Sequence, residues 1–255
     1  MERQYLIIPQ IDELEQSFAL AKEYDAAFEY NDFFDPLVYG QEEEWRKRVE
    51  IYKSLPRERS KDTLHGVFLD IAFTSKDTKI REYSRKLMKQ SMSIAEKLGV
   101  KGVVFHSGLI GSLNTPAYLN GWVQEAEGFY RELAMEFSGT EIYLENTFER
   151  SPETLVRLKE RMADVDNFFL CLDYGHACLT PTDIQLWVEA FRGKTGHIHL
   201  NDNDLVDDLH EVPGEGKIDF IQCKKELGQL EGVSVLLELT GIEKQKRALT
   251  YMKNL

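Results

Sequence analysis

Nine histidine and carboxylate side chains stand at the ends of short apolar segments of the sequence or in the loops that follow them. They are His65, His106, Glu145, Asp173, His176, His199, Asp208, His210 and Glu238. Imidazole together with carboxylate, without cysteine, is a ligand set that suits Zn²⁺, Mn²⁺, Fe²⁺ or Co²⁺ better than Ca²⁺. The residue types therefore predict a site for a divalent metal.

These side chains need a counter-charge if the fold brings them together. Carboxylates and imidazoles that converge out of water carry a severe electrostatic and desolvation penalty while they stay charged and unpaired. Buried ion pairs with lysine or arginine are the alternative, but the apolar segments around Glu145, Asp173, His199 and Glu238 contain no such cation. We therefore expect divalent cations to remove the penalty.

The elements that would position these side chains follow from an alternating pattern. Apolar, β-branched or aromatic segments predict eight strands, which begin near Gln4, Ala26, Thr63, Lys101, Glu141, Phe168, Thr195 and Val233. Segments with apolar residues three and four apart predict helices over residues 12–24, 42–55, 79–98, 121–137, 152–162, 219–227 and 243–252. Eight alternations of strand and helix predict a single (β/α)8 TIM barrel that fills residues 1–255 as one domain.

In such a barrel, reactive groups lie where the strands end and the βα loops begin. The third to eighth predicted strands end in this way at His65, His106, Glu145, Asp173, His199 and Glu238. Because side chains alternate along a strand, Tyr143 shares a face with Glu145, and His197 shares one with His199. These carboxylates and imidazoles should therefore point into the barrel.

Two loops supply the remaining three side chains. A turn through Gly175 follows the sixth strand and brings in His176. The 17-residue stretch 201–217 follows the seventh strand and carries Asp208 and His210. A loop of this length in a compact domain is usually functional, and its two glycines would let it fold tightly over the barrel mouth.

Several of these positions also have purely structural interpretations. His65 could be a satisfied core histidine, and His176 could cap the turn that follows the sixth strand. Asp208 and His210 could be solvated loop residues. His197 points the same way as His199 but lies deeper, and we interpret it as structural.

Composition excludes some classes of function. The chain has 42% hydrophobic residues and 31 Lys+Arg against 44 Asp+Glu, a net charge of −13 that disfavours nonspecific nucleic-acid binding. It has no apolar run of the roughly 20 residues that a membrane span needs, and its first residues show no signal-peptide pattern. The three cysteines, Cys171, Cys178 and Cys223, form no CxxC motif. These features predict a cytoplasmic protein without membrane association, disulfides or a thiolate zinc site.

Four segments resemble a known family, the xylose-isomerase-like barrels, which include sugar isomerases and epimerases and endonuclease IV. They are LEN at 144–146, LDYGHA at 172–177, HIHLNDND at 197–204 and DLHEVPGEGKIDF at 208–220. The resemblance implies that Glu145, Asp173, His199 and Glu238 hold one metal. It also implies that His65 and His106 share an ion with Glu145, and that His176, Asp208 and His210 hold another, so that one to three ions of Zn, Mn, Co or Fe are expected.

The resemblance leaves three functions open: a metal-dependent isomerase or epimerase, an endonuclease IV-like phosphodiesterase with three metals, and a metal-binding barrel without catalysis. The βα loops at residues 31–40, 107–121, 174–184 and 200–216 contain no Lys or Arg. A DNA-binding face needs several such cations for the phosphates. We therefore expect a small, neutral, carbohydrate-like substrate and not a nucleic acid.

The expected chemistry is proton transfer beside a carbonyl group. Glu145 or Glu238 would remove and return the proton, and His176 would orient or polarise an oxygen. A hydride shift is the alternative route. Epimerases carry an arginine in the loop after the seventh strand, where this chain has Asp208 and His210, which argues against simple ketohexose epimerisation. The substrate, the native metal and the oligomeric state stay open.

Overall fold

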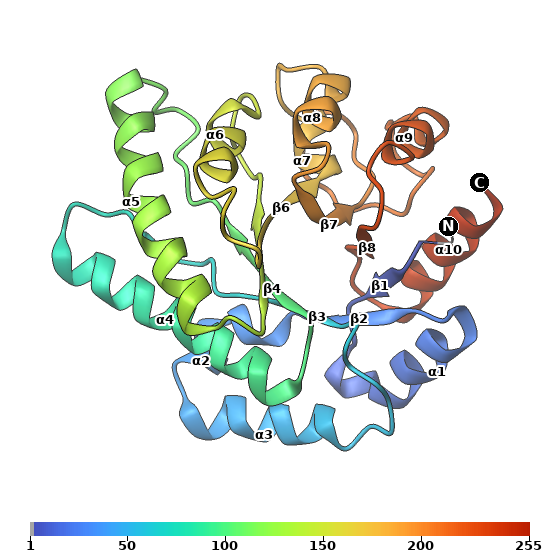
Figure 1. The fold of residues 1–255 in the computed structure, drawn as a ribbon. Coiled ribbons are helices and arrows are strands. Elements are labelled where there is room, and N and C mark those ends of the chain that lie inside the picture. The colour runs from blue at the N-terminus through green and yellow to red at the C-terminus, as the bar shows by residue number, and fades with distance from the viewer. Residues whose placement is uncertain (1–2) are drawn as a thin grey trace.

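Eight short parallel strands pair in chain order and close into a barrel, with the helices arranged around it (Figure 1). The computed structural model describes residues 3–255. The strands are β1 (Tyr5–Ile7), β2 (Ala27–Tyr30), β3 (Thr63–His65), β4 (Gly102–His106), β5 (Glu141–Glu145), β6 (Phe168–Asp173), β7 (Thr195–Leu200) and β8 (Ser234–Leu237). The predicted (β/α)8 TIM barrel is therefore confirmed, including the short third strand.

The helices cover the outside of the barrel or lie in its loops. They are α1 (Leu14–Tyr24), α2 (Pro36–Tyr39), α3 (Glu42–Lys53), α4 (Thr78–Leu98), α5 (Pro116–Glu136), α6 (Glu153–Arg161), α7 (Tyr174–Cys178), α8 (Ile184–Phe191), α9 (Phe220–Leu227) and α10 (Ile242–Asn254). Two 3-10 helices, η1 (Ile11–Glu13) and η2 (Asp32–Phe34), lie in the first two βα loops. No helix of the described residues is both long and apolar enough to span a membrane.

The helix ends explain where the sequence prediction was wrong. Helix α5 begins at Pro116 and not at residue 121, because the Thr115 side chain accepts the N–H of Tyr118 and proline suits the first helical position. Helix α8 was not predicted. It is short, and the side chain of Asp183 caps it by accepting the N–H of Gln185.

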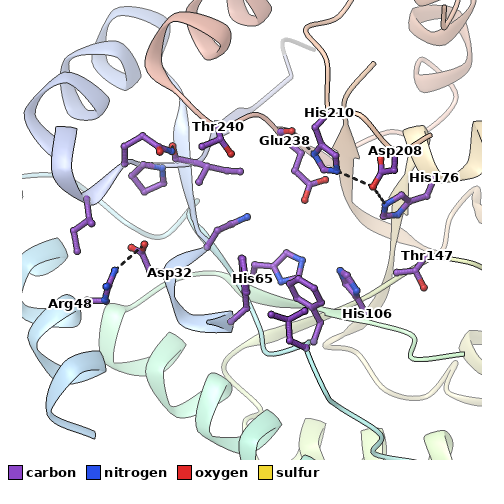
Figure 2. Close-up of a pocket in the computed structure, with 18 of the residues that line it drawn as sticks. Asp32, Arg48, His65, His106, Thr147, His176, Asp208, His210, Glu238 and Thr240 are labelled. Carbon is purple, nitrogen blue, oxygen red and sulfur yellow. Dashed lines mark hydrogen bonds and ion pairs between the residues drawn. The ribbon is translucent and has the colours of Figure 1, made fainter. Parts of the chain in front are cut away.

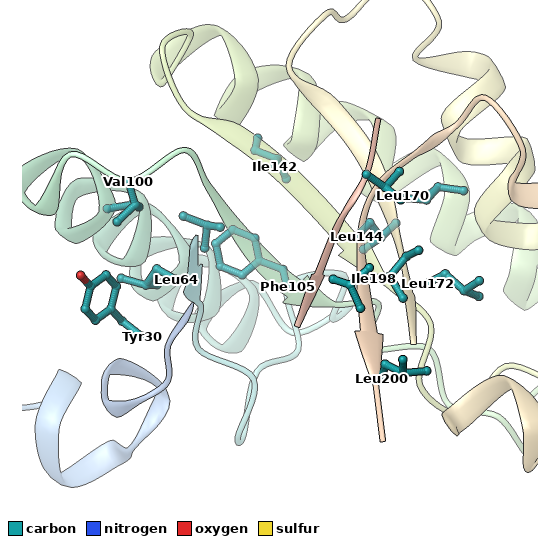
Figure 3. Packing of buried hydrophobic residues seen from close by; sticks show 14 of the residues in the cluster. Tyr30, Leu64, Val100, Phe105, Ile142, Leu144, Leu170, Leu172, Ile198 and Leu200 are labelled. Carbon is teal, nitrogen blue, oxygen red and sulfur yellow. The ribbon is translucent and has the colours of Figure 1, made fainter. Parts of the chain in front are cut away.

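Because side chains alternate along each strand, one set of buried side chains points into the barrel and another points toward the surrounding helices. Val104, Tyr143 and Cys171 pack inside the barrel. Leu144, Leu170, Leu172, Ile198 and Leu200 belong to the larger cluster between the strands and the helices (Figure 3). The register pairs Asp173 of β6 with His199 of β7 and places Glu145 of β5 beside His106 of β4. Polar side chains at the strand ends therefore meet at one mouth, while apolar neighbours anchor the same strands to the helices.

Candidate metal centre

The carboxyl ends of the strands open into a pocket of about 1250 Å³. Six of the nine predicted ligands line it: His65, His106, His176, Asp208, His210 and Glu238 (Figure 2). Glu145, Asp173 and His199 lie beneath them and are fully buried. The pocket thus has a floor of ionisable groups in a part of the barrel that water does not reach freely.

Glu145 stands at the centre of this floor. Its Oε2 lies 3.6 Å from Nε2 of His65 and 3.5 Å from Nε2 of His106. Its Oε1 lies 3.5 Å from Nδ1 of His176 and 3.6 Å from Nδ1 of His199. Burial alone would raise the pKa of Glu145, but the surrounding imidazoles hold that pKa well below its usual range. The carboxylate is therefore ionised.

Asp173 and Glu238 complete the group around His199. Oε2 of Glu238 lies 3.3 Å from Nδ1 of His199. Oδ1 of Asp173 accepts the backbone N–H of His176 at 2.6 Å. Asn146 fixes the two strand ends, because its side chain donates to the carbonyl of Asp173 and accepts the N–H of Asp173, both at 2.9 Å. Asn146, the asparagine of the LEN segment, therefore fixes the positions of Glu145 and Asp173 relative to each other.

A second group consists of His176, Asp208 and His210. Oδ2 of Asp208 lies 3.1 Å from Nε2 of His176 and 3.1 Å from Nε2 of His210 (Figure 2). Burial alone would lower the pKa of His210, but the hydrogen bond to Asp208 raises it to about 9. Without a metal, protons on the imidazoles supply the positive charge that this carboxylate needs.

The loop between β7 and α9 holds Asp208 and His210 over the mouth through one carboxylate. Asp202 accepts the N–H groups of Gly214, Gly216 and Ile218 at 2.9 to 3.0 Å. Gly214 has a φ of 87°, and a Cβ at Gly216 would lie 2.4 Å from Oδ1 of Asp202. Both glycines are therefore required where the loop folds back, as the sequence predicted.

Three histidines have their ring orientation set by backbone carbonyls. Nδ1 of His65 lies 2.9 Å from the carbonyl oxygen of Gly66, Nδ1 of His176 lies 3.0 Å from that of Asn146, and Nδ1 of His210 lies 2.9 Å from that of Glu238. A neutral ring that donates from Nδ1 presents a lone pair at Nε2. Histidines that bind metals almost always make such a second hydrogen bond.

The buried polar atoms test whether the residues suit a metal. Within residues 3–255, both Glu145 oxygens, Oδ2 of Asp173, Oε2 of Glu238 and both His199 nitrogens are buried without a hydrogen-bond partner. Buried polar atoms are normally satisfied. Together they offer the imidazole and carboxylate set that a transition metal prefers, so the residues fit a divalent ion.

The structure brings all nine predicted ligands into such groups. In each group, one ligand atom per residue lies within 4.8 Å of the others. The groups include His65, His106 and Glu145; Glu145, Asp173 and His199; His65, His199 and Glu238; and His176, Asp208 and His210. The carboxyl ends of the strands and the loops that follow them therefore bring these side chains together, as the strand pattern predicted.

Sequence reasoning missed two features of the site. Glu29 of β2 is fully buried beside His197 and His199. Its signal was a carboxylate in the middle of the apolar segment AAFEY. Arg48 of α3 also lines the pocket, although the preceding loop contains no cation. It lies 3.2 Å from Asp32 and 3.3 Å from Glu44, so its charge is already paired.

A sequence profile of the xylose isomerase-like TIM barrel family matches residues 18–255. The chain belongs to this family. An uncharacterised protein of Methanocaldococcus jannaschii is 27% identical over 183 residues, which make up 69% of this chain and 69% of that protein. A probable endonuclease 4 of Mycobacterium ulcerans is 30% identical over 172 residues, or 61% of this chain and 64% of that protein. The alignment thus spans less than two thirds of the endonuclease.

Solved structures of two further proteins share the fold over nearly the whole chain. A D-tagatose 3-epimerase-like protein superposes with a TM-score of 0.77 at 22% identity and covers 98% of this chain and 96% of its own. A protein of Thermus thermophilus, soaked with ZnCl2, superposes with a TM-score of 0.76 at 22% identity and covers 99% and 97%. At these identities, the likeness establishes the architecture alone.

Proposed function

We propose that this protein is a divalent-metal-dependent isomerase or epimerase that acts on a small neutral sugar or a related hydroxy-ketone. One observation carries the proposal. Unsatisfied carboxylate and imidazole atoms of Glu145, Asp173, His199 and Glu238 gather at the floor of a pocket whose cationic side chain, Arg48, is already paired. An ion held by these four residues would acidify a carbon-bound proton beside a chelated carbonyl.

Glu238 is the best-placed base. It lines the pocket, whereas Glu145 is wholly buried beneath it. Burial alone would raise the pKa of Glu238, but the charge of His199 holds that pKa at about 2. The carboxylate is therefore ionised at neutral pH, which is the form that can accept a proton from the substrate. His176 lines the same pocket and would orient a substrate oxygen.

The pocket wall favours a neutral polyol over a phosphorylated substrate. Among the described residues that line it, Arg48 is the one Lys or Arg, whereas Asp12, Glu13 and Asp32 add negative charge. A phosphate needs several unpaired cations or backbone N–H donors. Phe34 and Phe68, whose rings are 4.7 Å apart, also line the pocket and could stack on a sugar ring.

An endonuclease IV-like phosphodiesterase is the second candidate. The groups His65, His106, Glu145 and His176, Asp208, His210 favour it, because they offer places for further ions. Clustered ions can activate water and stabilise a leaving oxygen. Its weakness is the acidic pocket lining, which within residues 3–255 offers no unpaired cation to the DNA backbone.

A paired assay separates the two activities. The Mn²⁺, Co²⁺ and Zn²⁺ forms would be incubated with sugars and keto acids in deuterated water, and in parallel with an abasic-site DNA duplex. Our proposal predicts metal-dependent exchange of deuterium into the carbon beside a carbonyl, and poor duplex binding even at low salt, where electrostatic association is strongest. Catalytic nicking of the duplex without any exchange would establish the phosphodiesterase instead.

A further inference from the structure

A buried polar layer lies inside the barrel directly below the candidate metal centre. It consists of Glu29 on β2, Thr63 on β3, and His197 on β7 with Ser234 on β8. Glu29, Thr63 and His197 are fully buried, and Ser234 is 8% exposed. A carboxylate in such a place needs a specific set of donors.

The hydrogen bonds of this layer form one chain. Oε2 of Glu29 accepts the hydroxyl of Thr63 at 2.6 Å and lies 3.1 Å from Nε2 of His197. Nδ1 of His197 lies 2.7 Å from the hydroxyl of Ser234. Since a carboxylate only accepts, His197 donates from Nε2, and its Nδ1 accepts from Ser234. Oε2 of Glu29 is therefore satisfied by two donors.

The other oxygen of Glu29 is left for His199. Oε1 of Glu29 has no hydrogen-bond partner among the described residues and lies 3.2 Å from Nε2 of His199. The opposite nitrogen of the same ring, Nδ1, lies 3.3 Å from Glu238 and 3.6 Å from Glu145. The His199 ring thus bridges the buried layer and the candidate metal centre.

We propose that Glu29, held by Thr63 and by the His197–Ser234 pair, is the positioning residue that keeps the proton of His199 on Nε2 and so presents Nδ1 to the metal. This proposal rests on the proposed metal site. When a metal engages the carboxylates on the Nδ1 side, Glu29 is the acceptor that remains for the ring, 3.2 Å from Nε2, so the one proton of the metal-bound ring stays there. The lone pair of Nδ1 then faces Glu145 and Glu238.

A second metal ion within this layer is the competing explanation, because Glu29, His197 and His199 form a compact group. The hydrogen bonds argue against it. Both nitrogens of His197 and Oε2 of Glu29 are already engaged, which leaves Oε1 of Glu29 and Nε2 of His199. Two free atoms fall short of the three or four protein ligands that a transition metal requires.

Glu29→Gln tests the proposal with little change in volume. Metal affinity would be measured on the full chain by competition between the protein and a coloured chelator, with Zn²⁺ and Co²⁺ as probes. We expect the affinity to fall by about 10- to 100-fold, as for other partners of metal-binding histidines. The visible absorption of the Co²⁺ form should also change, because loss of Glu29 frees the orientation of the His199 ring.

Asp62→Asn is the matched control. Asp62 is another fully buried carboxylate, and it holds the same strand as Glu29 by accepting the N–H of Phe28 at 2.8 Å and the hydroxyl of Tyr30 at 2.9 Å. Its other partner is Arg57, so its recorded contacts include no candidate ligand. Its replacement should lower the unfolding temperature while the metal affinity and the Co²⁺ spectrum stay those of the parent.

Ser234→Ala provides a second test of the proposal if Glu29→Gln does not fold. It removes the donor to Nδ1 of His197, and we expect a loss of affinity of about two- to tenfold, the worth of one neutral hydrogen bond. Parent-like affinity in folded Glu29→Gln, or in Ser234→Ala where Glu29→Gln does not fold, would overturn the positioning role. A parent protein that binds no ion would overturn the metal site itself, and the positioning role with it.

Discussion

Glu238 is the side chain at which the pocket and the candidate metal centre meet. Its carboxylate contacts His199, and its backbone carbonyl fixes the ring of His210. Glu238 thus takes part in both groups of ligands. A change at Glu238 therefore tests the chemistry more sharply than a change at the buried Glu145.

Glu238→Gln should abolish turnover while the fold stays intact. The substitution keeps the size of the side chain but removes the charge that accepts the proton, which corresponds to a loss of at least about 100-fold in kcat. Glu189→Gln on the exposed surface of α8 serves as the control. Retention of more than about a tenth of the parent activity would remove Glu238 from the role of general base.

His210 should give the metal-free protein a pH-dependent stability. Its pKa in the folded state is about 9, above the ordinary value of 6.5, because the pairing with Asp208 outweighs the effect of burial. A raised folded-state pKa stabilises the fold fully below the unfolded value, and this contribution is lost as the pH rises through the folded value. We expect the difference in unfolding temperature between the parent and His210→Gln to be largest near about pH 6 and to close by about pH 10.

The Asp208→Asn background provides the control for this measurement. Without this carboxylate, the pKa of His210 loses the hydrogen bond that raises it, so His210→Gln should add little pH-dependent change. A difference between the parent and His210→Gln that stays constant from about pH 6 to pH 10 would contradict the proposed pairing.

At the scale of elements, the loop between β7 and α9 does more than connect them. Asp202 organises its return by accepting three backbone N–H groups. In Asp202→Asn, one carboxylate oxygen becomes an NH2 group that faces N–H donors. The loop should loosen, so that its amide hydrogens exchange faster with solvent and the His176, Asp208 and His210 group binds metal more weakly.

Asp219→Asn is the matched control for the loop. Asp219 caps α9 by accepting the N–H groups of Ile221 and Gln222 through a single oxygen, Oδ1. Asparagine retains such an oxygen and caps helices equally well. Amide exchange in the β7 to α9 loop should therefore stay at the parent rate. Equal loosening in both variants would show that Asp202 has no special part in holding the loop.

The strands were easier to predict than the helices and the buried polar layer below the candidate metal centre. Strand alternation placed Glu145 and His199 on the inner face. Neighbouring side chains of a strand point to opposite faces, so a shift of one residue would move every side chain of the strand to the wrong face. Helix α8 was missed because six of its 8 residues, IQLWVEAF, are apolar, so the sequence shows no clear alternation of apolar and polar faces at helical spacing. Glu29 was missed because it lies inside β2 and not at a strand end, and its role depends on contacts with β7.

At the scale of the whole molecule, barrel closure is what makes the site. Its nine candidate ligands come from β3 to β8 and from the loops that follow them, so that distant parts of the chain each contribute side chains. Contacts between such distant parts exist only once the barrel has closed. A bound ion should therefore stabilise the closed barrel against thermal unfolding, by about 2.7 kcal/mol at a free concentration about 100 times its dissociation constant.

Metal content is the measurement that tests the central claim most directly. The parent protein and Glu145→Gln would be purified with Zn²⁺, Mn²⁺, Co²⁺ or Fe²⁺, dialysed against a weak chelator and assayed by elemental analysis. Our account predicts at least one tightly bound transition-metal ion per parent chain and a clear loss in Glu145→Gln, because Glu145 lies beside four candidate ligands. Only trace metal in the parent under all four conditions would contradict it.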